Sequence, residues 1–245
     1  MHLKIPSARG GLRQAGCPSL SANLASYNLL DCWLNRDMLM PRSMGRAMDV
    51  KEAIQLIHQG NAILLLGAGF SVPSKNKLHQ QLPTGGQLAK LLASDLDIPD
   101  QYPLPIIASQ YIDKLGDESL TSRLSDIFTV ETVTPDQERI VNLPWRRAYT
   151  LNYDNVVEHI YKLRGNRLVN LDYIDHVRTA DGPLQYIHLH GELHSGTQSA
   201  SSLVLNVESY NSLSAQSGWF SRFRSDIELA DCIFAIGCSL SDLHL

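Results

Sequence analysis

ILLLGAGFS, residues 63–71, is the stretch of this sequence that decides its fold. The apolar run begins at Ala62 and ends directly in Gly67 and Gly69, as is typical of a buried strand followed by a tight turn of bare main chain. Glycine permits positive φ and lets another group approach the backbone, whose amides can then bind a phosphate. The turn alone leaves two interpretations open: a phosphate-binding loop, or a turn that needs glycine only for steric reasons.

Three more short apolar runs end in small or polar residues: RAYTLNYD at 147–154, YIHLHG at 186–191 and CIFAIGCS at 232–239. Segments with helix-like patterns lie between the runs. Short strands that alternate with helices are typical of a parallel sheet covered on both faces. The sequence therefore predicts an α/β fold, with a Rossmann-like doubly wound parallel sheet and a small helical insertion module.

Several helix starts can be predicted from capping residues. DVKE at 49–52 predicts a capping box that opens a short helix, which Gly60 ends. TGGQ at 84–87 repeats this pattern before an apolar helix face. TPDQ at 134–137 places a proline at the first position of a further helix.

The predicted domain boundaries follow from these patterns. Residues 98–144 are expected to form the all-helical small module, inserted into a domain that spans 48–245. Residues 1–47 show no clear periodicity and are predicted to be an appendage of uncertain order. Because the sequence stops just after a motif-bearing strand, we expect a chain that is truncated after Leu245.

The composition is that of an ordinary globular protein. The 245 residues are 44% hydrophobic and 19% charged, which is enough apolar material for a sizeable core. The net charge is −4 and the pI is about 6.1, and long runs of like charge do not occur. Because nucleic-acid binding needs clustered Lys and Arg, nucleic acid is not expected as a partner.

The cysteines and the hydropathy argue against a metal-binding, disulfide-bonded, secreted or membrane protein. Cys17, Cys32, Cys232 and Cys238 form no CxxC pair and no four-ligand zinc pattern, so neither a metal nor a disulfide framework is predicted. No apolar stretch approaches the roughly 20 residues that span a bilayer, and no secretory signal sequence is recognisable. We therefore expect a cytoplasmic protein with no membrane partner.

In a doubly wound sheet, a ligand lies outside the carboxyl ends of the strands. Two common phosphate motifs are excluded: GxGxxG requires glycine where Val72 stands, and no GxxxxGK followed by Ser or Thr occurs. The candidate site residues are those that close each run: Gly67, Ala68, Gly69 and Ser71 after the first, Thr150, Asn152 and Asp154 after the second, His190 and Gly191 after the third, and Gly237, Ser239 and Asp242 after the fourth.

The polar members of this set have competing interpretations. Asn152 offers a donor and an acceptor to a ribose hydroxyl or a water, or it simply stabilises a turn. Asp154 and Asp242 are each interpreted either as a helix cap or as a ligand contact. His190 stands at its strand end beside a glycine and can take a proton near neutral pH, whereas His188, deeper in the run, is predicted to be structural.

The order of GAGFS, TLNYD, LHG and IGCSLSDLHL resembles the sirtuin-like family, in particular its bacterial branch of antiphage-defence effector domains. The resemblance covers about residues 62–245, and LPTGGQLAKLL at 82–92 is also similar. It implies a Rossmann-like fold with a helical small module, NAD bound in the cleft between them, and cleavage of the bond between nicotinamide and ribose.

The resemblance also implies a role for each matching residue. His190 would be the catalytic histidine, with Asn152 as the second catalytic residue beside the nicotinamide ribose. The remaining residues would bind NAD: Gly67, Ala68, Gly69 and Ser71 at the pyrophosphate and ribose, Asp154 near the nicotinamide ribose, Gly237 and Ser239 at the adenosine half, and Thr150, Gly191 and Asp242 beside them.

Departures from the family indicate which reaction to expect. The protein deacylases carry a Pro, Asp, Phe, Arg segment after their glycine turn, a Gln before the Asn and a four-cysteine zinc ribbon. Here VPSKNK follows Ser71, Leu151 replaces the Gln, and the ribbon is missing. Water is then the natural acceptor, so the leading hypothesis is an NAD glycohydrolase, without a metal, that depletes NAD in antiphage defence.

Two alternatives remain at this point: a non-catalytic module that binds NAD or ADP-ribose, and an NAD-dependent deacylase. The partners expected are NAD and either a homo-oligomer or further effector or sensor domains or subunits.

Overall fold

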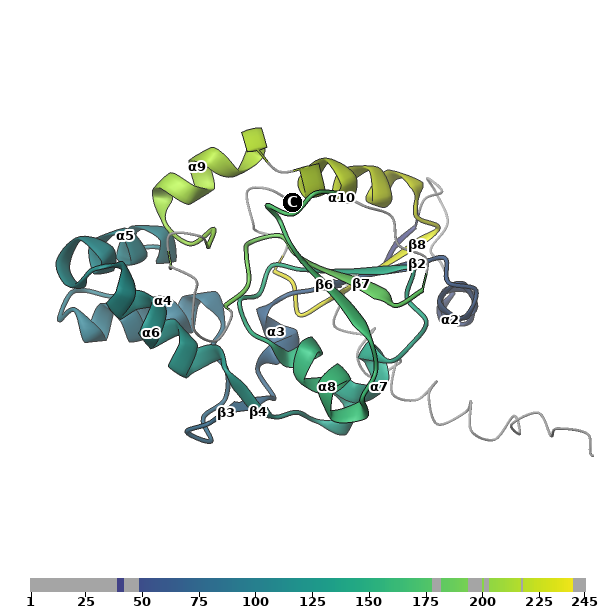
Figure 1. The fold of residues 1–245 in the computed structure, drawn as a ribbon, viewed down its shortest axis with the longest axis horizontal. Coiled ribbons are helices and arrows are strands. Elements are labelled where there is room, and N and C mark those ends of the chain that lie inside the picture. The colour runs from purple at the N-terminus through teal and green to yellow at the C-terminus, as the bar shows by residue number, and fades with distance from the viewer. Residues whose placement is uncertain are drawn as a thin grey trace, which may run out of the picture.

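The computed structural model describes residues 39–41, 49–177, 182–193, 200, 203–216 and 218–239 (Figure 1). Residues 1–38 and 42–47 of the predicted N-terminal appendage therefore lie outside the described residues, as does Asp242.

A six-stranded sheet forms the centre of the described chain, in the order β1-β8-β2-β5-β7-β6. The edge strand β1 runs antiparallel to β8, and all other neighbouring strands are parallel. The predicted Rossmann-like α/β fold is thus confirmed. The strands are β1 (Leu39–Pro41), β2 (Ala62–Leu66), β5 (Arg147–Thr150), β6 (Leu168–Asp172), β7 (Leu184–His188) and β8 (Cys232–Ile236).

β2 is the point at which the strand order reverses. The chain passes from β2 to β5 on one side and returns much later to form β8 on the other. The connections therefore diverge at the carboxyl end of β2, which leaves a crevice there in sheets of this type.

Alternating side chains of β2 supply both cores of the protein. Leu64 and Leu66 pack with α2 (Val50–His58) and α8 (Val156–Arg164), whereas Ile63 and Leu65 pack with α10 (Gly218–Leu229). Figure 1 shows α10 on one side of the sheet and α7 and α8 on the other. Both faces of the sheet are therefore covered, which explains why its strands read as continuous apolar runs.

Helices inserted between β2 and β5 extend one of these cores sideways. α4 packs against α5, and α5 against α6, beside the sheet in Figure 1. Their buried side chains belong to the same cluster as Leu64 of β2, so they add to that core rather than forming one of their own. The elements are α3 (Ala68–Ser71), β3 (Lys75–Asn76), α4 (Gly85–Asp95), α5 (Leu104–Leu115), α6 (Asp117–Phe128), β4 (Val130–Thr132) and α7 (Pro135–Val141).

One of the two predicted capping boxes is confirmed: Thr84 and Gln87 exchange both hydrogen bonds of the box. Thr134 and Gln137 form a second full box that was not predicted, at the helix whose first-position proline was predicted. At α2 only half of the box forms: the Asp49 side chain accepts a bond from the Lys51 amide at 3.4 Å, and the structure shows no return bond from the third helical position. The full box predicted there is wrong.

Gln137 also reaches beyond its own helix. It is fully buried, and its Nε2 donates to the Phe70 carbonyl at 2.7 Å and to Ser74 Oγ at 2.9 Å. One amide side chain thus joins the start of α7 to the turn after β2.

The last helix before α10 bridges the two parts of the molecule. α9 (Val207–Gln216) contacts α5, and its Val207 amide donates to Ser109 Oγ at 3.4 Å. Figure 1 shows α9 extending from α10 towards α5. Among the described residues, no helix combines the length and the apolar character that crossing a membrane requires.

Candidate functional site

A cavity of about 970 Å³ opens at the carboxyl ends of β2, β5, β7 and β8, where the strand order reverses. Segments predicted from four separate motifs form its sheet side, and α4, α5, α6 and α9 contribute the opposite side. Its lining includes Gly67–Gly69, residues 151–154, His190 and 237–239 from the sheet side, and 83–86, 103–106, Phe128, Val207 and Tyr210 from the other.

Most of the predicted site residues line this cavity: Gly67, Ala68, Gly69, Asn152, Asp154, His190, Gly237 and Ser239. Ser71 and Thr150 are buried behind the wall and bind residues that form it. Gly191 follows His190 with a φ of +86°, a conformation that explains the glycine there. Asp242 lies outside the described residues.

The glycines after β2 pack directly against the loop after β8. The Gly67 amide donates to the Ile236 carbonyl at 2.9 Å, and the Gly69 amide to the Gly237 carbonyl at 3.0 Å. A Cβ on Gly67 would lie 2.5 Å from the Gly237 oxygen, and one on Gly237, whose φ is +69°, would lie 2.1 Å from the Phe70 nitrogen. The close packing of the two loops therefore requires glycine at these positions.

This packing also determines which amide of the turn is left for a ligand. The Gly67 and Gly69 amides are used by the β8 loop. The Ala68 amide, between them at the cavity wall, has no hydrogen-bond acceptor in the part of the chain that the structure describes.

Asn152 connects the β5 loop to the glycine turn. Its Nδ2 donates to the Gly67 carbonyl and to Ser71 Oγ, each at 3.0 Å. Thr150 shapes the same loop, because its hydroxyl accepts from the Asn152 amide at 3.0 Å and donates to the Leu66 carbonyl at 3.2 Å. Both amide hydrogens of Asn152 are thus engaged, and Oδ1 is the polar atom that these bonds leave over.

Asp154 lies one residue before Asn155, the N-cap of α8. Its Oδ1 accepts a bond from the Val156 amide at 3.1 Å at the start of α8, and the residue also lines the cavity. Burial raises the pKa of this carboxyl to about 6, although hydrogen bonds from Ser71 and Val156 act to lower it. A carboxyl of this kind changes its charge close to neutral pH.

His190 is held by aromatic side chains. It is only 2% exposed, and its carbonyl accepts from the Val204 amide at 2.9 Å. The Tyr210 ring meets the imidazole edge to face, with centroids 5.5 Å apart, and the Phe220 ring lies nearly parallel to it at 6.4 Å. These contacts restrict the plane of the imidazole at the cavity wall.

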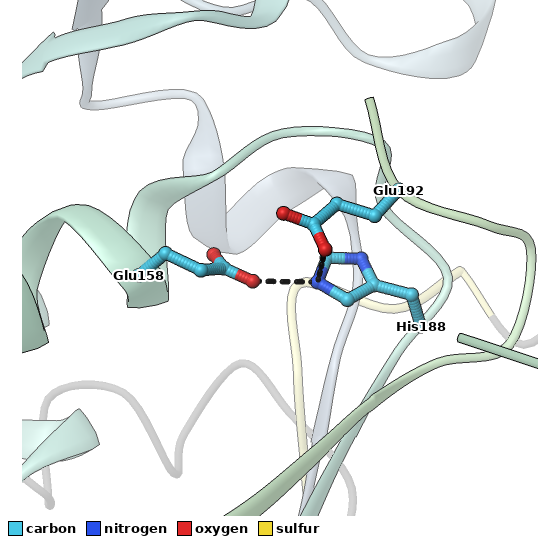
Figure 2. A group of neighbouring side chains, drawn as sticks. All are labelled: Glu158, His188 and Glu192. Carbon is cyan, nitrogen blue, oxygen red and sulfur yellow. Dashed lines mark hydrogen bonds and ion pairs between the residues drawn. The ribbon is translucent and has the colours of Figure 1, made fainter. Parts of the chain in front are cut away.

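His188 lies behind this wall in a polar cluster of its own (Figure 2). It is fully buried, its Nδ1 lies 3.2 Å from the Asn152 carbonyl, and its Nε2 lies 2.7 Å from Glu158 Oε1. Burial alone would lower the pKa of His188, but the Glu158 carboxylate, with a smaller effect from Glu192, raises it to about 9. Neither glutamate was predicted from the sequence.

Other residues of the cavity were not predicted from the sequence either. Leu104, Ile106 and Phe128 give the helical side of the cavity an apolar surface, and Tyr210 comes from α9. In the sequence each belongs to an amphipathic helix, where an apolar or aromatic residue indicates core packing and not a binding site.

Comparisons with known proteins agree with the geometry. Residues 146–245 match the family model described as a SIR2-like domain, and they contain every predicted motif except the glycine turn and the segment after it. A protein of Cytobacillus dafuensis named NAD(+) hydrolase ThsA is 30% identical over 112 residues, or 44% of this chain and 22% of that protein. The chain thus matches less than a quarter of this relative. Both similarities support the sirtuin-like family that the motifs indicate.

Proposed function

We propose that this chain is a sirtuin-like protein that hydrolyses NAD⁺ to nicotinamide and ADP-ribose, as its match to the SIR2-like domain and its similarity to a protein named NAD(+) hydrolase suggest. The observation that supports the proposal most directly is the cavity, in which His190 shares a wall with the glycine turn, Asn152 and the β8 loop. Its volume of about 970 Å³ lies at the upper end of the range typical of ligand pockets, which suits a dinucleotide.

The dinucleotide would lie across the strand ends. Its pyrophosphate would face the turn after β2, where the Ala68 amide is left for an anion. Its adenosine half would contact Gly237 and Ser239. Ring contacts would come from the apolar side of the cavity, which includes Leu104 and Phe128.

The reaction needs few groups. The bond between the ribose C1′ and the nicotinamide nitrogen breaks, its electron pair leaves with nicotinamide, and an oxocarbenium-like ribose develops. Water attacks C1′, and His190 takes up the proton that this water loses. Asn152 Oδ1 accepts a hydrogen bond from the water or from a ribose hydroxyl, because Nδ2 is occupied by the glycine turn and Ser71.

The test is chromatography of NAD⁺ incubated with the purified protein. We expect equal amounts of nicotinamide and ADP-ribose, and a rate about 10²- to 10⁴-fold lower for His190→Ala, the usual contribution of one acid or base. His58→Ala is the control, because this histidine is exposed in the last turn of α2 and does not line the cavity.

Other outcomes would overturn the proposal. Tight NAD⁺ binding without turnover would indicate a regulatory module that binds NAD⁺ or ADP-ribose. Product that forms only with an acylated peptide would indicate a deacylase. An unchanged rate for His190→Ala would remove this histidine from the mechanism.

We further propose that the activity serves antiphage defence in the cytoplasm by depleting NAD⁺, in a homo-oligomer or together with further domains or subunits. The support is the motif order and the similarity to a protein named as an NAD(+) hydrolase. In cells that carry the gene, His190→Ala should abolish both the loss of NAD⁺ after infection and the protection against phage. Protection that persists in this variant would exclude NAD⁺ depletion as the means of defence.

A further inference from the structure

Glu158, His188 and Glu192 form a cluster behind the cavity wall, in which His188 and Glu192 are buried and Glu158 is partly exposed (Figure 2). One ligand-type atom from each residue lies within 4.8 Å of the other two. His188 comes from β7, Glu158 from the first turn of α8, and Glu192 from the segment after β7. The cluster therefore joins three segments that the fold brings together.

The tautomer of His188 follows from its neighbours. Its Nδ1 lies 3.2 Å from the Asn152 carbonyl, which can only accept, so Nδ1 carries a hydrogen. Nε2 faces two carboxylates, with Glu158 Oε1 at 2.7 Å and Glu192 Oε2 at 3.9 Å. Either a proton or a cation must lie between Nε2 and these oxygens. A histidine whose other nitrogen donates to a carbonyl is the usual arrangement of a metal ligand.

The carboxylate of Glu192 is oriented by a hydrogen bond, as the carboxylates that bind metal ions in proteins usually are. Asn170 Nδ2 donates a hydrogen bond to Glu192 Oε2, the oxygen that faces His188. Outer hydrogen bonds of this kind orient ligating carboxylates in metal sites.

Negative charge exceeds positive charge around His188. The Asp172 carboxyl belongs to the residue paired with His188 between the parallel strands β6 and β7, so both side chains lie on one face of the sheet. Asp172 is 92% buried, and its Oδ1 has no hydrogen-bond partner among the described residues; the same holds for Glu158 Oε2. Buried carboxylate oxygens without partners are costly, and one proton on His188 cannot compensate three carboxylates.

We propose that Glu158, His188 and Glu192 bind one divalent transition-metal ion, and that Zn²⁺ is the ion that suits them best. An imidazole nitrogen with two carboxylate oxygens fits Zn²⁺, whereas Mg²⁺ prefers oxygen ligands alone. The cysteines take no part in this site, so it differs from the zinc ribbon that the chain lacks.

The distances suit such an ion. Ligand atoms about 2.1 Å from a tetrahedral ion lie roughly 3.4 Å from one another. The distances from Nε2, 2.7 Å to Glu158 and 3.9 Å to Glu192, lie on either side of this value. Small rotations of the two glutamate side chains bring all three atoms into place, and a water completes the coordination.

The ion would stabilise the structure and would not act as a catalytic group. It would bind Nε2 of His188, whose Nδ1 donates to the Asn152 carbonyl. Asn152 Nδ2 in turn donates to the Gly67 carbonyl in the glycine turn. A metal in the cluster would thus fix the β5 loop relative to α8 and β7, one layer behind the cavity.

The experiment is calorimetric titration of the full, tag-free chain with ZnCl₂ after treatment with EDTA. We expect one equivalent to bind and the midpoint of thermal unfolding to rise. Glu158→Gln and Glu192→Gln should each weaken binding by about 100-fold or more, and Asn170→Ala, which removes only an outer hydrogen bond, by 10- to 100-fold. MgCl₂ should bind far more weakly.

Glu131→Gln is the matched control, because Glu131 forms a His–Glu pair with His79 at 3.7 Å on the surface. Circular dichroism confirms that each variant folds, and Asn170→Ala decides the question if a glutamine variant does not. No binding, or binding that these substitutions leave unchanged, would overturn the proposal and leave a proton between His188 and Glu158. The titration uses no NAD⁺, so its result is independent of hydrolase activity.

Discussion

Replacing Asp154 by Asn is expected to stabilise the protein at neutral pH and to lower its activity. The carboxyl is 2% exposed, and burial raises its pKa to about 6 from the usual 3.8. Asparagine has nearly the same shape and keeps an oxygen that can accept from the Val156 amide. The substitution therefore removes a buried charge at pH 8 and little else.

The magnitude follows from the two pKa values. The folded state binds the proton more tightly than the unfolded state, so the stabilisation present below pH 4 is lost as the pH rises through about 6. At 1.36 kcal/mol per pKa unit, the ionised carboxyl costs roughly 3 kcal/mol above pH 7. About half of this cost develops between pH 5 and pH 8. The difference in unfolding free energy between Asp154→Asn and wild type should thus grow by about 1.5 kcal/mol over this interval.

Urea denaturation at pH 5 and pH 8 measures this difference, since unfolding free energy falls linearly with urea concentration. If the difference in unfolding free energy between Asp154→Asn and wild type does not change with pH, or is smaller at pH 8, the assignment of Asp154 as a desolvated carboxyl is refuted. NAD⁺ turnover measured on the same samples should fall, because Asp154 lines the cavity. Gain in stability with loss of activity is the usual result when a strained site residue is relieved.

Two further substitutions test the packing behind the site, with urea denaturation as the measurement. Gly237→Ala places a methyl group 2.1 Å from the Phe70 nitrogen at a φ of +69°, so it should lower the free energy of unfolding by more than about 3 kcal/mol or prevent folding. Gly60→Ala has a similar φ of +70° but open space around it, so it should lower the free energy of unfolding by only about 1 to 2 kcal/mol. Gln137→Ala removes buried hydrogen bonds to Phe70 and Ser74 and should lower the free energy of unfolding by about 2 to 4 kcal/mol. Gln87→Ala, in an exposed capping box, should lower it by about 1 kcal/mol or less. Equal costs within either pair would contradict the packing described.

The strands that the sequence predicts are those buried on both faces. β2, β5, β7 and β8 read as apolar runs because helices cover both sides of the sheet. β6 was missed because it is an edge strand, whose run Leu168–Asp172 is interrupted by Asn170 and Asp172. These two polar residues face the cluster around His188, which periodicity alone cannot reveal.

The same limit applies to the site. His190 could be selected from the sequence because it stands at a strand end beside a glycine, at the edge of the sheet where ligands of doubly wound folds lie. Tyr210 and Glu158 lie on helices and reach the site only through tertiary contacts, Tyr210 on the ring of His190 and Glu158 on Nε2 of His188. Their sequence neighbourhoods are ordinary amphipathic helices, so no local pattern distinguishes them.

The contact between the glycine turn and the β8 loop has a consequence for the newly made chain. Residues 67–69 leave the ribosome early, but their partners at 236 and 237 are translated some 170 residues later. At 5–20 residues per second, this interval lasts on the order of ten seconds or more. Until then the wall of the cavity stays open on one side, so the nascent chain lacks a complete site while it is still being synthesised.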